Sequence, residues 1–341
     1  MILAIESSCD ETSIAVIEKT KVLSNIISTQ FFHKKYGGVV PELASRSHLQ
    51  NIAFLTKQAL LEANVNMEQI TAIGVTTEPG LVGALIVGTN FAKGLAIRYG
   101  IPLVPVNHIE GHIFSGFLSE FKEGKHPEFP IISLVVSGGH TAIFYVKDYN
   151  NYEIIGLTRD DAAGEAFDKI AKLCWLDYPG GPLIDKYAKK GNRNKYQFPR
   201  SMINSGDYDF SFSGLKTSVR YFLQDKFPDG INEELIPDIA ASVQAAIVDV
   251  LVAKTINAAK EYKVKDIIIS GGVSANSSLR EEMLNETERY KINCIVPNMS
   301  YCMDNAAMIG YIAEKKLEDK RTNYNKFDFI VSANALRSMK R

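Results

Sequence analysis

The sequence predicts an α/β protein with two domains, and three observations support this prediction. The chain has 341 residues, which suggests about two domains, and 46% of them are hydrophobic, which allows substantial cores. Each half begins with a strand–turn–strand pattern and continues with strand–glycine–helix units. Such units predict two α/β domains around a cleft, with ligands at the carboxyl ends of the strands.

The first half of the chain is expected to begin with three strands and then to alternate helices and strands. Short apolar runs indicate the strands, and apolar residues at helical spacing indicate the helices. Pro41 opens a long amphipathic helix, because proline suits the first helical turn. The expected strands are 1–5, 13–17, 22–28, 71–77 and 102–106, and the expected helices are 41–63 and 81–99.

The second half repeats this kind of pattern. It is expected to begin with an apolar strand and a hairpin and to continue mainly with helices. The expected strands are 130–136, 141–146, 152–157 and 266–269, and the expected helices are 160–173, 215–224, 236–262 and 304–317. We expect the charged and weakly patterned residues after about Glu318 to be peripheral.

Composition excludes several broad classes of protein. The formal net charge is −1, so RNA binding would need a local patch or the help of partners. The four cysteines form no C-x-x-C pair, which indicates a reducing cytosol. Only five residues precede Glu6, too few for a signal peptide, and the uncharged run 79–92 is too short to span a bilayer. We therefore expect a cytoplasmic protein that does not bind membranes.

Two of the six histidines, His108 and His112, are four residues apart just after an expected strand. On a helix this spacing places both imidazoles on one face, where they can bind one metal ion. Glu110 lies about 200° around the helix from His108, so the geometry of the zinc-protease pattern H-E-x-x-H is absent. A third ligand must come from elsewhere. Asp304 is a candidate, although its place at the start of the last expected helix also suits an N-cap.

Glycine pairs follow two of the apolar strands, in Ser137-Gly-Gly and Ser270-Gly-Gly. Glycines at such positions let backbone N–H groups face phosphate oxygens without obstruction by a Cβ atom. One such turn is more often structural, whereas several in one chain favour a nucleotide site. The sequence contains no G-x-x-x-x-G-K-[ST], and no G-x-G-x-x-G opens a helix, so the P-loop and dinucleotide interpretations are weak.

The turn between the first two strands contains Cys9, Asp10 and Glu11. Carboxylates at such a turn commonly hold a metal–phosphate complex or position a nucleophile, and the alternative is ordinary turn chemistry. Asp10 and Glu11 are our candidates for a general base. Cys9 has no histidine near it in the sequence, so we expect an inert buried thiol.

Three cationic segments are candidates for contacts with RNA phosphates. Each by itself is more typical of a solvated surface. The segments are Lys34-Lys35-Tyr36, the loop from Lys189 to Tyr196, and the stretch from Lys216 to Arg220.

A series of motifs closely resembles the tRNA threonylcarbamoyladenosine transferase family, whose bacterial members are called TsaD. The resemblance runs from Met1 to about Glu314, and GGVVPELASR is similar to the bacterial or organellar branch. In chain order the motifs are IESSCDET, GGVVPELASR, PGLVGALIVG, HIEGH, LVVSGGHT, DDAAGEAFDK, YPGGP, FSFSGLKT, SGGVSAN and DNAAM.

The resemblance implies an actin-like and sugar-kinase-like (ASKHA) fold, with duplicated ribonuclease-H-like domains around a nucleotide cleft. The first lobe would comprise residues 1–107 and 303–325, the second 108–302, and 326–341 would form a peripheral tail. By the same resemblance, His108, His112 and Asp304 hold one divalent metal, most often Fe²⁺ and alternatively Zn²⁺. The residues implied to bind the adenylate substrate, or ATP or ADP, are Val135, Val136, Ser137, Gly138, Gly139, Asp168, Gly181, Asp185 and Asn276.

The implied reaction moves the threonylcarbamoyl group of threonylcarbamoyl-adenylate to an exocyclic amine in tRNA. The acceptor is the adenosine on the 3′ side of the anticodon, in tRNAs that read codons beginning with A. The resemblance also implies four partners: the tRNA anticodon loop, a smaller TsaB-like paralogous subunit, a TsaE-like ATPase subunit, and a threonylcarbamoyl-AMP synthase that supplies the substrate.

Other functions remain as alternatives. A sugar-kinase-like phosphotransferase on the same fold would not explain the HIEGH histidines, and a metalloprotease is disfavoured by the position of Glu110. A non-catalytic paralogue would not need the three implied metal ligands together. A small-molecule carbamoyltransferase carries a similar module but usually has further domains, for which this chain has no room.

Overall fold

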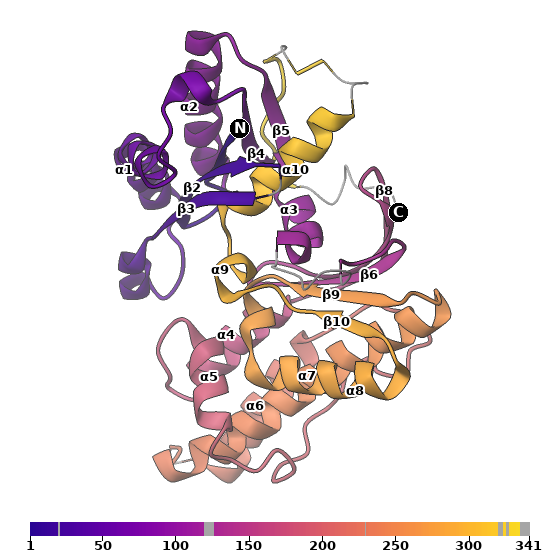
Figure 1. Ribbon diagram of the computed structural model, residues 1–341. Coiled ribbons are helices and arrows are strands. Elements are labelled where there is room, and N and C mark those ends of the chain that lie inside the picture. Colours follow the sequence, from indigo (N-terminus) through magenta and orange to yellow (C-terminus); the bar gives the residue numbers. More distant parts are fainter. Residues whose placement is uncertain (20, 119–125, 229, 320–322, 325–326, 335–341) are drawn as a thin grey trace. The chain divides into compact units, whose positions relative to one another are not determined.

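A computed structural model describes residues 1–19, 21–118, 126–228, 230–319, 323–324 and 327–334 (Figure 1). The chain forms two compact units. Unit 1 is Met1–Gly124 with Pro297–Lys340, and unit 2 is Lys125–Val296. The family resemblance implies a second lobe that starts at residue 108 and ends at residue 302. The contacts divide the chain after Gly124 and after Val296 instead, so both HIEGH histidines belong to unit 1.

Unit 1 is built on a five-stranded mixed sheet with the order β3-β2-β1-β4-β5. The first three strands form an antiparallel meander, and β4 and β5 continue from β1 in parallel. Parallel strands need long crossover connections, and helices supply them here. The strands are β1 (Ile2–Glu6), β2 (Glu11–Glu18), β3 (Lys21–Thr29), β4 (Ala72–Glu78) and β5 (Leu103–Asn107).

Helices cover both faces of this sheet, because successive side chains of a strand point to opposite faces. Leu3 packs in a core with Ile52 of α1 and Ala92 of α2. Ala4 faces the other way, toward Gly310 of α10, and Figure 1 shows α10 across the sheet from α1 and α2. The helical elements of unit 1 are η1 (Phe31–Tyr36), α1 (Pro41–Glu62), η2 (Met67–Gln69), α2 (Val82–Tyr99), α3 (His108–Phe114), η3 (Ser115–Leu118), α9 (Met299–Cys302) and α10 (Ala306–Glu318).

Unit 2 repeats this strand arrangement, with its five strands in the order β8-β7-β6-β9-β10. Again the first three strands form an antiparallel meander, and the last two run parallel to the first. The two sheets therefore share one topology, as duplicated domains would. The strands are β6 (Ile131–Val136), β7 (Thr141–Asp148), β8 (Asn151–Leu157), β9 (Asp266–Ser270) and β10 (Asn293–Ile295).

The helices of unit 2 share one large apolar core with the sheet. Its central helix, α7, is long and apolar enough to cross a membrane by composition, but most of it is buried inside unit 2. It is therefore a core helix of the domain. The helical elements are α4 (Ala163–Leu173), α5 (Gly180–Ala188), α6 (Ser213–Lys226), η4 (Glu233–Leu235), α7 (Ile236–Glu261), η5 (Gly272–Ala275) and α8 (Ser277–Tyr290).

The segment after α10 packs on unit 1. Phe327 and Phe329 lie against the core that β1, α1 and α2 form. The Lys93 ammonium lies 4.5 Å from the centroid of the Phe329 ring, and Ser332 N–H donates to the Thr77 carbonyl. Of the expected peripheral tail, residues 326 and 335–341 lie outside the described residues.

Candidate metal centre

Helix α3 begins directly after β5, and a capping box defines its start. The Asn107 side chain accepts a hydrogen bond of 2.8 Å from Ile109 N–H, and the Glu110 carboxylate accepts one from Asn107 N–H. This cap satisfies N–H groups that otherwise lack partners at a helix start. It makes His108 the first helical residue, so His112 lies one turn further on the same face, with ring centroids 4.7 Å apart.

Glu110 has a structural role away from the imidazoles. Besides closing the capping box, its carboxylate lies 2.6 Å from the Lys316 ammonium of α10. This position agrees with the helical spacing, which turns Glu110 away from His108 and His112. The general-base position of zinc proteases therefore has no counterpart in this motif.

Gly111 lets α3 approach α10 closely. A Cβ atom at this position would lie 2.8 Å from Met308 Cγ and 3.1 Å from Ile309 Cδ1. Both contacts are tighter than side chains normally make, so a larger residue would have to displace the Met308 side chain or move the helices apart. The glycine between the two histidines thus brings them toward the start of α10.

Asp304 precedes α10 without capping it, which corrects one sequence-based interpretation. The helix begins at Ala306, and its N-cap is Asn305, whose side chain accepts from Met308 N–H at 3.0 Å. Asn305 is therefore the residue that fills the capping role. The carboxylate of Asp304 is left to face α3.

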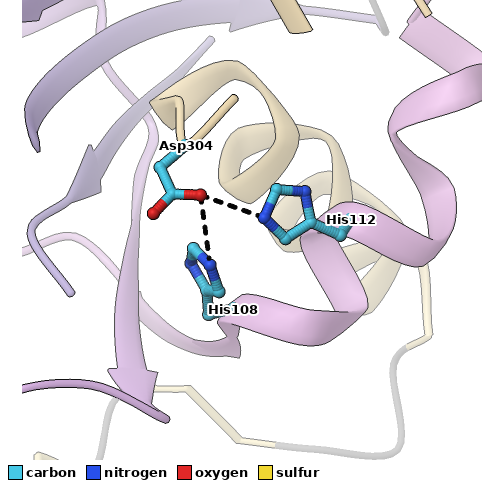
Figure 2. Close-up of side chains that lie close together, drawn as sticks. All are labelled: His108, His112 and Asp304. Carbon is cyan, nitrogen blue, oxygen red and sulfur yellow. Dashed lines mark hydrogen bonds and ion pairs between the residues drawn. The ribbon is translucent and has the colours of Figure 1, made fainter. Parts of the chain in front are cut away.

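The structure brings the three predicted ligands together (Figure 2). Asp304 Oδ1 lies 3.1 Å from His112 Nε2 and 3.4 Å from His108 Nε2. The three ligand atoms lie within 4.8 Å of one another. Metal–nitrogen and metal–oxygen bonds of about 2.0–2.2 Å in a tetrahedral site separate two ligands by about 3.3 Å, close to both nitrogen–oxygen distances. Two imidazoles and one carboxylate also suit Fe²⁺ or Zn²⁺ chemically, so these residues fit a metal.

Glu6 is a neighbour of this site that the sequence analysis missed. Its fully buried carboxylate lies 3.1 Å from His108 Nδ1, on the side of the ring opposite Asp304. It also accepts hydrogen bonds from Ser8 N–H at 2.6 Å and from the Thr76 hydroxyl at 2.5 Å. In the sequence, Glu6 could have been noticed because it ends an otherwise apolar strand. A carboxylate buried there needs hydrogen-bond partners.

Attraction between the histidines and the carboxylates shifts the pKa values of this cluster. Burial opposes ionisation of Asp304, but the His108 charge and hydrogen bonds from both histidines hold the pKa of Asp304 well below its ordinary value. Burial likewise opposes protonation of His108, yet Asp304 and Glu6 raise the pKa of His108 well above its usual value. Burial lowers the pKa of His112, which is therefore neutral at pH 7. A proton on His108 therefore offsets the negative charge of the Asp304 and Glu6 carboxylates. A bound cation would offset the same charge.

The acidic turn lies beside this cluster. Burial, followed by repulsion from Asp304 and Asp10, raises the pKa of Glu11 to about 9, so Glu11 carries a proton at neutral pH. Burial and the charges of Asp10 and Asp304 raise the pKa of Cys9, which therefore stays a thiol, as expected of an inert cysteine. His48 of α1 holds the turn, because its ring lies 2.9 Å from the Cys9 carbonyl and 2.7 Å from the Thr12 hydroxyl.

The residues implied to bind an adenylate all lie in unit 2, and two of its turns meet at one sheet edge. The parallel strands β6 and β9 pair Val135 with Ser270, so both Ser-Gly-Gly turns leave the sheet at the same end. Gly271 has φ +87°, and a Cβ atom there would lie 2.4 Å from the Val136 carbonyl oxygen. Glycine is required at this position for both reasons. Added Cβ atoms at Gly138 and Gly139 would meet nothing within 4 Å.

Hydrogen bonds of α5 connect the remaining adenylate candidates to one another. Asp168 accepts hydrogen bonds from Gly180 N–H at 2.7 Å and Gly181 N–H at 3.3 Å, the first residues of α5. Asp185, further along α5, accepts from the Ser277 hydroxyl at 2.7 Å. Asn276 caps α8, with its side chain accepting from Leu279 N–H, and donates to Gln244. These residues thus form one connected region of unit 2.

The cationic segments differ in how many of their side chains form ion pairs with carboxylates. In the loop from Lys189 to Tyr196, Arg193 pairs with Asp249 and Glu282, and Lys189 lies 3.3 Å from Asp185. In η1, by contrast, Lys34 and Lys35 are exposed, and Lys34 lies 5.4 Å from the Phe31 ring centroid.

Comparison with solved structures identifies the class of fold. Full-length HypF in its phosphate- and nucleotide-bound form aligns with a TM-score of 0.61 at 14% identity, over 94% of this chain and 56% of that chain. Component A of (R)-2-hydroxyglutaryl-CoA dehydratase from Acidaminococcus fermentans aligns with a TM-score of 0.52 at 13% identity, over 92% and 97%. Together with the duplicated sheet, these matches place the chain in the actin-like and sugar-kinase-like class, as the resemblance predicted.

Sequence comparison identifies the family within that class. A relative from Thermosipho africanus is 50% identical over 320 residues, covering 93% of this chain and 95% of its own length. One from Clostridium botulinum is 54% identical over 315 residues, covering 92% and 91%. Both are named tRNA N6-adenosine threonylcarbamoyltransferase, and the TsaD family model of that description matches residues 21–311. The chain belongs to this family.

Proposed function

We propose that this protein transfers the threonylcarbamoyl group of threonylcarbamoyl-adenylate to the N6 amine of the adenosine that follows the anticodon in tRNA. The observation that carries the proposal is the convergence of His108, His112 and Asp304 in a member of this family. The proposed acceptors are tRNAs that read codons beginning with A. A sugar-kinase-like phosphotransferase would have no use for this ligand set.

His108, His112 and Asp304 would hold one divalent ion, Fe²⁺ or alternatively Zn²⁺, through two ring nitrogens and a carboxylate oxygen. When bound, such an ion supplies Lewis acidity toward an oxygen of the acyl-adenylate. The protein's own contribution is rigid placement of the ligands, with α3 capped at Asn107 and packed on α10 through Gly111.

The adenylate is proposed to bind to unit 2, at the edge where β6 and β9 end. Backbone N–H groups of Ser137, Gly138 and Gly139 are suited to phosphate oxygens, and no Cβ atom obstructs the two glycines. Val135 and Val136 end the strand beneath them. Asp168 accepts from Gly181 N–H at the start of α5, and Asp185 of α5 accepts from Ser277 N–H, next to Asn276. Donors placed before the reaction can stabilise charge that develops on the departing phosphate.

Asp10 and Glu11 are the proposed groups for proton transfer. The attacking amine must lose a proton, and a carboxylate can accept it. Because Glu11 is protonated at neutral pH, it serves as a hydrogen-bond donor while Asp10 serves as the acceptor.

The proposed partners follow from the substrate. The tRNA anticodon loop presents unstacked bases that a protein can reach. A threonylcarbamoyl-AMP synthase would supply the adenylate, and a TsaB-like paralogue and a TsaE-like ATPase would assist the cycle.

The proposal is tested by incubating the protein with threonylcarbamoyl-adenylate, unmodified tRNA and the partner subunits, followed by mass spectrometry of the nucleosides. We expect modified adenosine with the wild type and none with His112→Ala, which removes a fully buried ligand. His126→Ala, at a histidine of unit 2, is the matched control and should retain activity. Absence of transfer with every combination of partners would refute the proposed reaction.

A further inference from the structure

Three groups contact the buried carboxylate of Glu6, and this arrangement determines which ring nitrogen of His108 carries a hydrogen. Oε1 accepts from Ser8 N–H, while Oε2 lies 2.5 Å from the Thr76 hydroxyl and 3.1 Å from His108 Nδ1. An ionised carboxylate only accepts hydrogen bonds. The Ser8 hydroxyl also lies 3.3 Å from Nδ1, but the Glu6 carboxylate is closer at 3.1 Å and can only accept, so Nδ1 carries a hydrogen when it faces Glu6. In a neutral ring Nε2 then presents its lone pair toward Asp304.

We propose that Glu6 is a positioning residue that holds His108 in the tautomer and orientation needed for Nε2 to bind the metal. This inference rests on the metal site under Proposed function. Carboxylates that accept from the second nitrogen of a metal-binding histidine fix its ring and strengthen its basicity. His112 has no such support, since its buried Nδ1 lacks a hydrogen-bond partner in the part of the chain that the structure describes. Of the two histidines, His108 is thus the one whose second nitrogen faces a carboxylate.

Glu6→Gln separates this role from simple packing, because the amide has the same shape but one oxygen has become a donor. If the amide oxygen stays on Ser8 N–H, the NH₂ group faces His108 Nδ1 and favours a lone pair there. The ring proton then moves to Nε2, the atom needed for the metal. If the amide turns over, two donors meet at Ser8 N–H.

The experiment measures Zn²⁺ affinity of the full chain by competition with a chelating dye, and the visible absorption of the Co²⁺-loaded protein. We expect Glu6→Gln to bind about 10–100-fold more weakly and to change the Co²⁺ spectrum. In the Zn²⁺-loaded wild type, long-range ¹H–¹⁵N NMR should place the His108 proton on Nδ1. The control is Asp266→Asn, the same change at a carboxylate of unit 2 that is also buried, which should leave Zn²⁺ affinity unchanged.

The outcomes distinguish this inference from the proposed metal site. A wild type that binds no divalent metal refutes the metal site, whereas a folded Glu6→Gln protein with wild-type affinity and spectrum overturns only the role of Glu6. If Glu6→Gln does not fold, Thr76→Ser and Thr76→Val replace it, because only the serine keeps the hydroxyl that holds Oε2. Weaker Zn²⁺ binding by Thr76→Val than by Thr76→Ser supports the role, and equal binding overturns it.

A second feature, independent of Glu6, is the exposed segment Phe31–Tyr36. The side chains of Phe31 and Tyr36 are 69% and 62% exposed, beside two exposed lysines, Lys34 and Lys35. The base of the segment is anchored, since buried His33 lies 3.0 Å from Gln30 Oε1 and accepts from Val40 N–H. The Phe31 and Tyr36 rings are therefore exposed on a segment whose base is fixed by hydrogen bonds.

The segment also begins at the acidic turn. The strand pair β2–β3 aligns Glu11 with Thr29, and Gln30 N–H donates to the Asp10 carbonyl at 3.1 Å. Aromatic rings stack on unpaired bases, and lysines contact phosphates, which is how proteins commonly bind single-stranded loops. We infer that Phe31–Tyr36 is a docking surface for the anticodon loop of tRNA, an inference that rests on the proposed transfer reaction.

The test uses a transcribed, unmodified tRNA and fluorescence anisotropy at several salt concentrations. Loss of one stacking ring in Phe31→Ala or Tyr36→Ala should weaken binding about tenfold. Lys34→Gln with Lys35→Gln should lower the slope of log affinity against log salt by about 1. The matched control is Phe54→Ala with Lys57→Gln, an exposed aromatic and lysine on α1 of the same unit, which should leave binding unchanged.

Wild-type tRNA affinity in the η1 variants, or an equal loss in the α1 control, overturns this inference. Unchanged tRNA binding with loss of association with another protein subunit also overturns it and assigns the segment to a protein interface. Transfer by the wild type is measured in parallel. If transfer occurs while the η1 variants bind tRNA normally, the reaction stands and only the docking surface is refuted.

Discussion

Asp304 and Asn305 are neighbours in the chain, but their side chains have different partners. Asn305 accepts from Met308 N–H and caps α10, while Asp304 lies 3.1 Å from His112 Nε2. Asn305 also donates to the Met303 carbonyl at 2.8 Å, which holds the backbone of the connection on both sides of Asp304. The cap thus leaves the Asp304 carboxylate available to the histidines.

Substitutions at these two positions should therefore separate metal binding from stability. Asp304→Asn removes the ligand charge and should abolish stoichiometric Zn²⁺ binding, measured by dialysis and metal analysis. Asn305→Ala should retain the metal but lower the free energy of unfolding by about 1 kcal/mol, the usual value of an N-cap. Similar metal loss in both variants would contradict the assignment.

Gly111→Ala should disturb the packing of α3 on α10. The added methyl group would lie 2.8 Å from Met308 Cγ, and such overpacking costs about 1–3 kcal/mol. Gly94→Ala on α2 is the control, because its methyl group would meet nothing within 4 Å. Since alanine is the better helix former, Gly94→Ala should stabilise by about 0.5–1 kcal/mol. Denaturant unfolding measures both, and a Gly111→Ala protein stabilised as much as Gly94→Ala would disprove the tight contact.

Glu11 should make stability depend on pH in the presence of a chelator. Burial and repulsion from Asp304 and Asp10 raise its pKa from 4.5 to about 9. A raised folded-state pKa contributes stability that is present below pH 4.5 and lost as the pH rises toward 9. Glu11→Gln has no proton to lose, so its stability advantage over the wild type should grow by about 2–4 kcal/mol between pH 5 and pH 8. Parallel stability curves for the two proteins would contradict a raised pKa.

Asp168→Ala should weaken nucleotide binding by unit 2. Its carboxylate holds Gly180 N–H and Gly181 N–H at the start of α5, and loss of these bonds frees that helix end. We expect AMP affinity, measured by calorimetry, to fall about tenfold, equivalent to about 1.4 kcal/mol. Asp249→Asn, which loses ion pairs with Arg193 and Arg200, should lower stability and leave AMP affinity intact. Unchanged AMP affinity in Asp168→Ala would remove this residue from the proposed site.

Much of the fold could be predicted because its signals are local. Apolar runs and helical periodicity located β1 to β7, α1, α2 and α7 to within a few residues. The helices α5 and α8 and the strand β10 were not among the expected elements, because they are short or have exposed polar faces. The spacing of His108 and His112 predicted a shared helix face for the same local reason, since residues four apart meet on any helix.

By itself, the sequence determined the two-domain α/β class, the order of the main elements and three residues capable of binding a metal. Only the tertiary structure decided how those residues meet. Asp304 reaches His112 across 192 positions because α10 packs against α3 at Gly111. Glu6 reaches His108 because only β4 separates β1 from β5 in the sheet. Such contacts depend on sheet order and helix packing, which bring distant segments together. The residues in contact therefore have no characteristic spacing in the sequence.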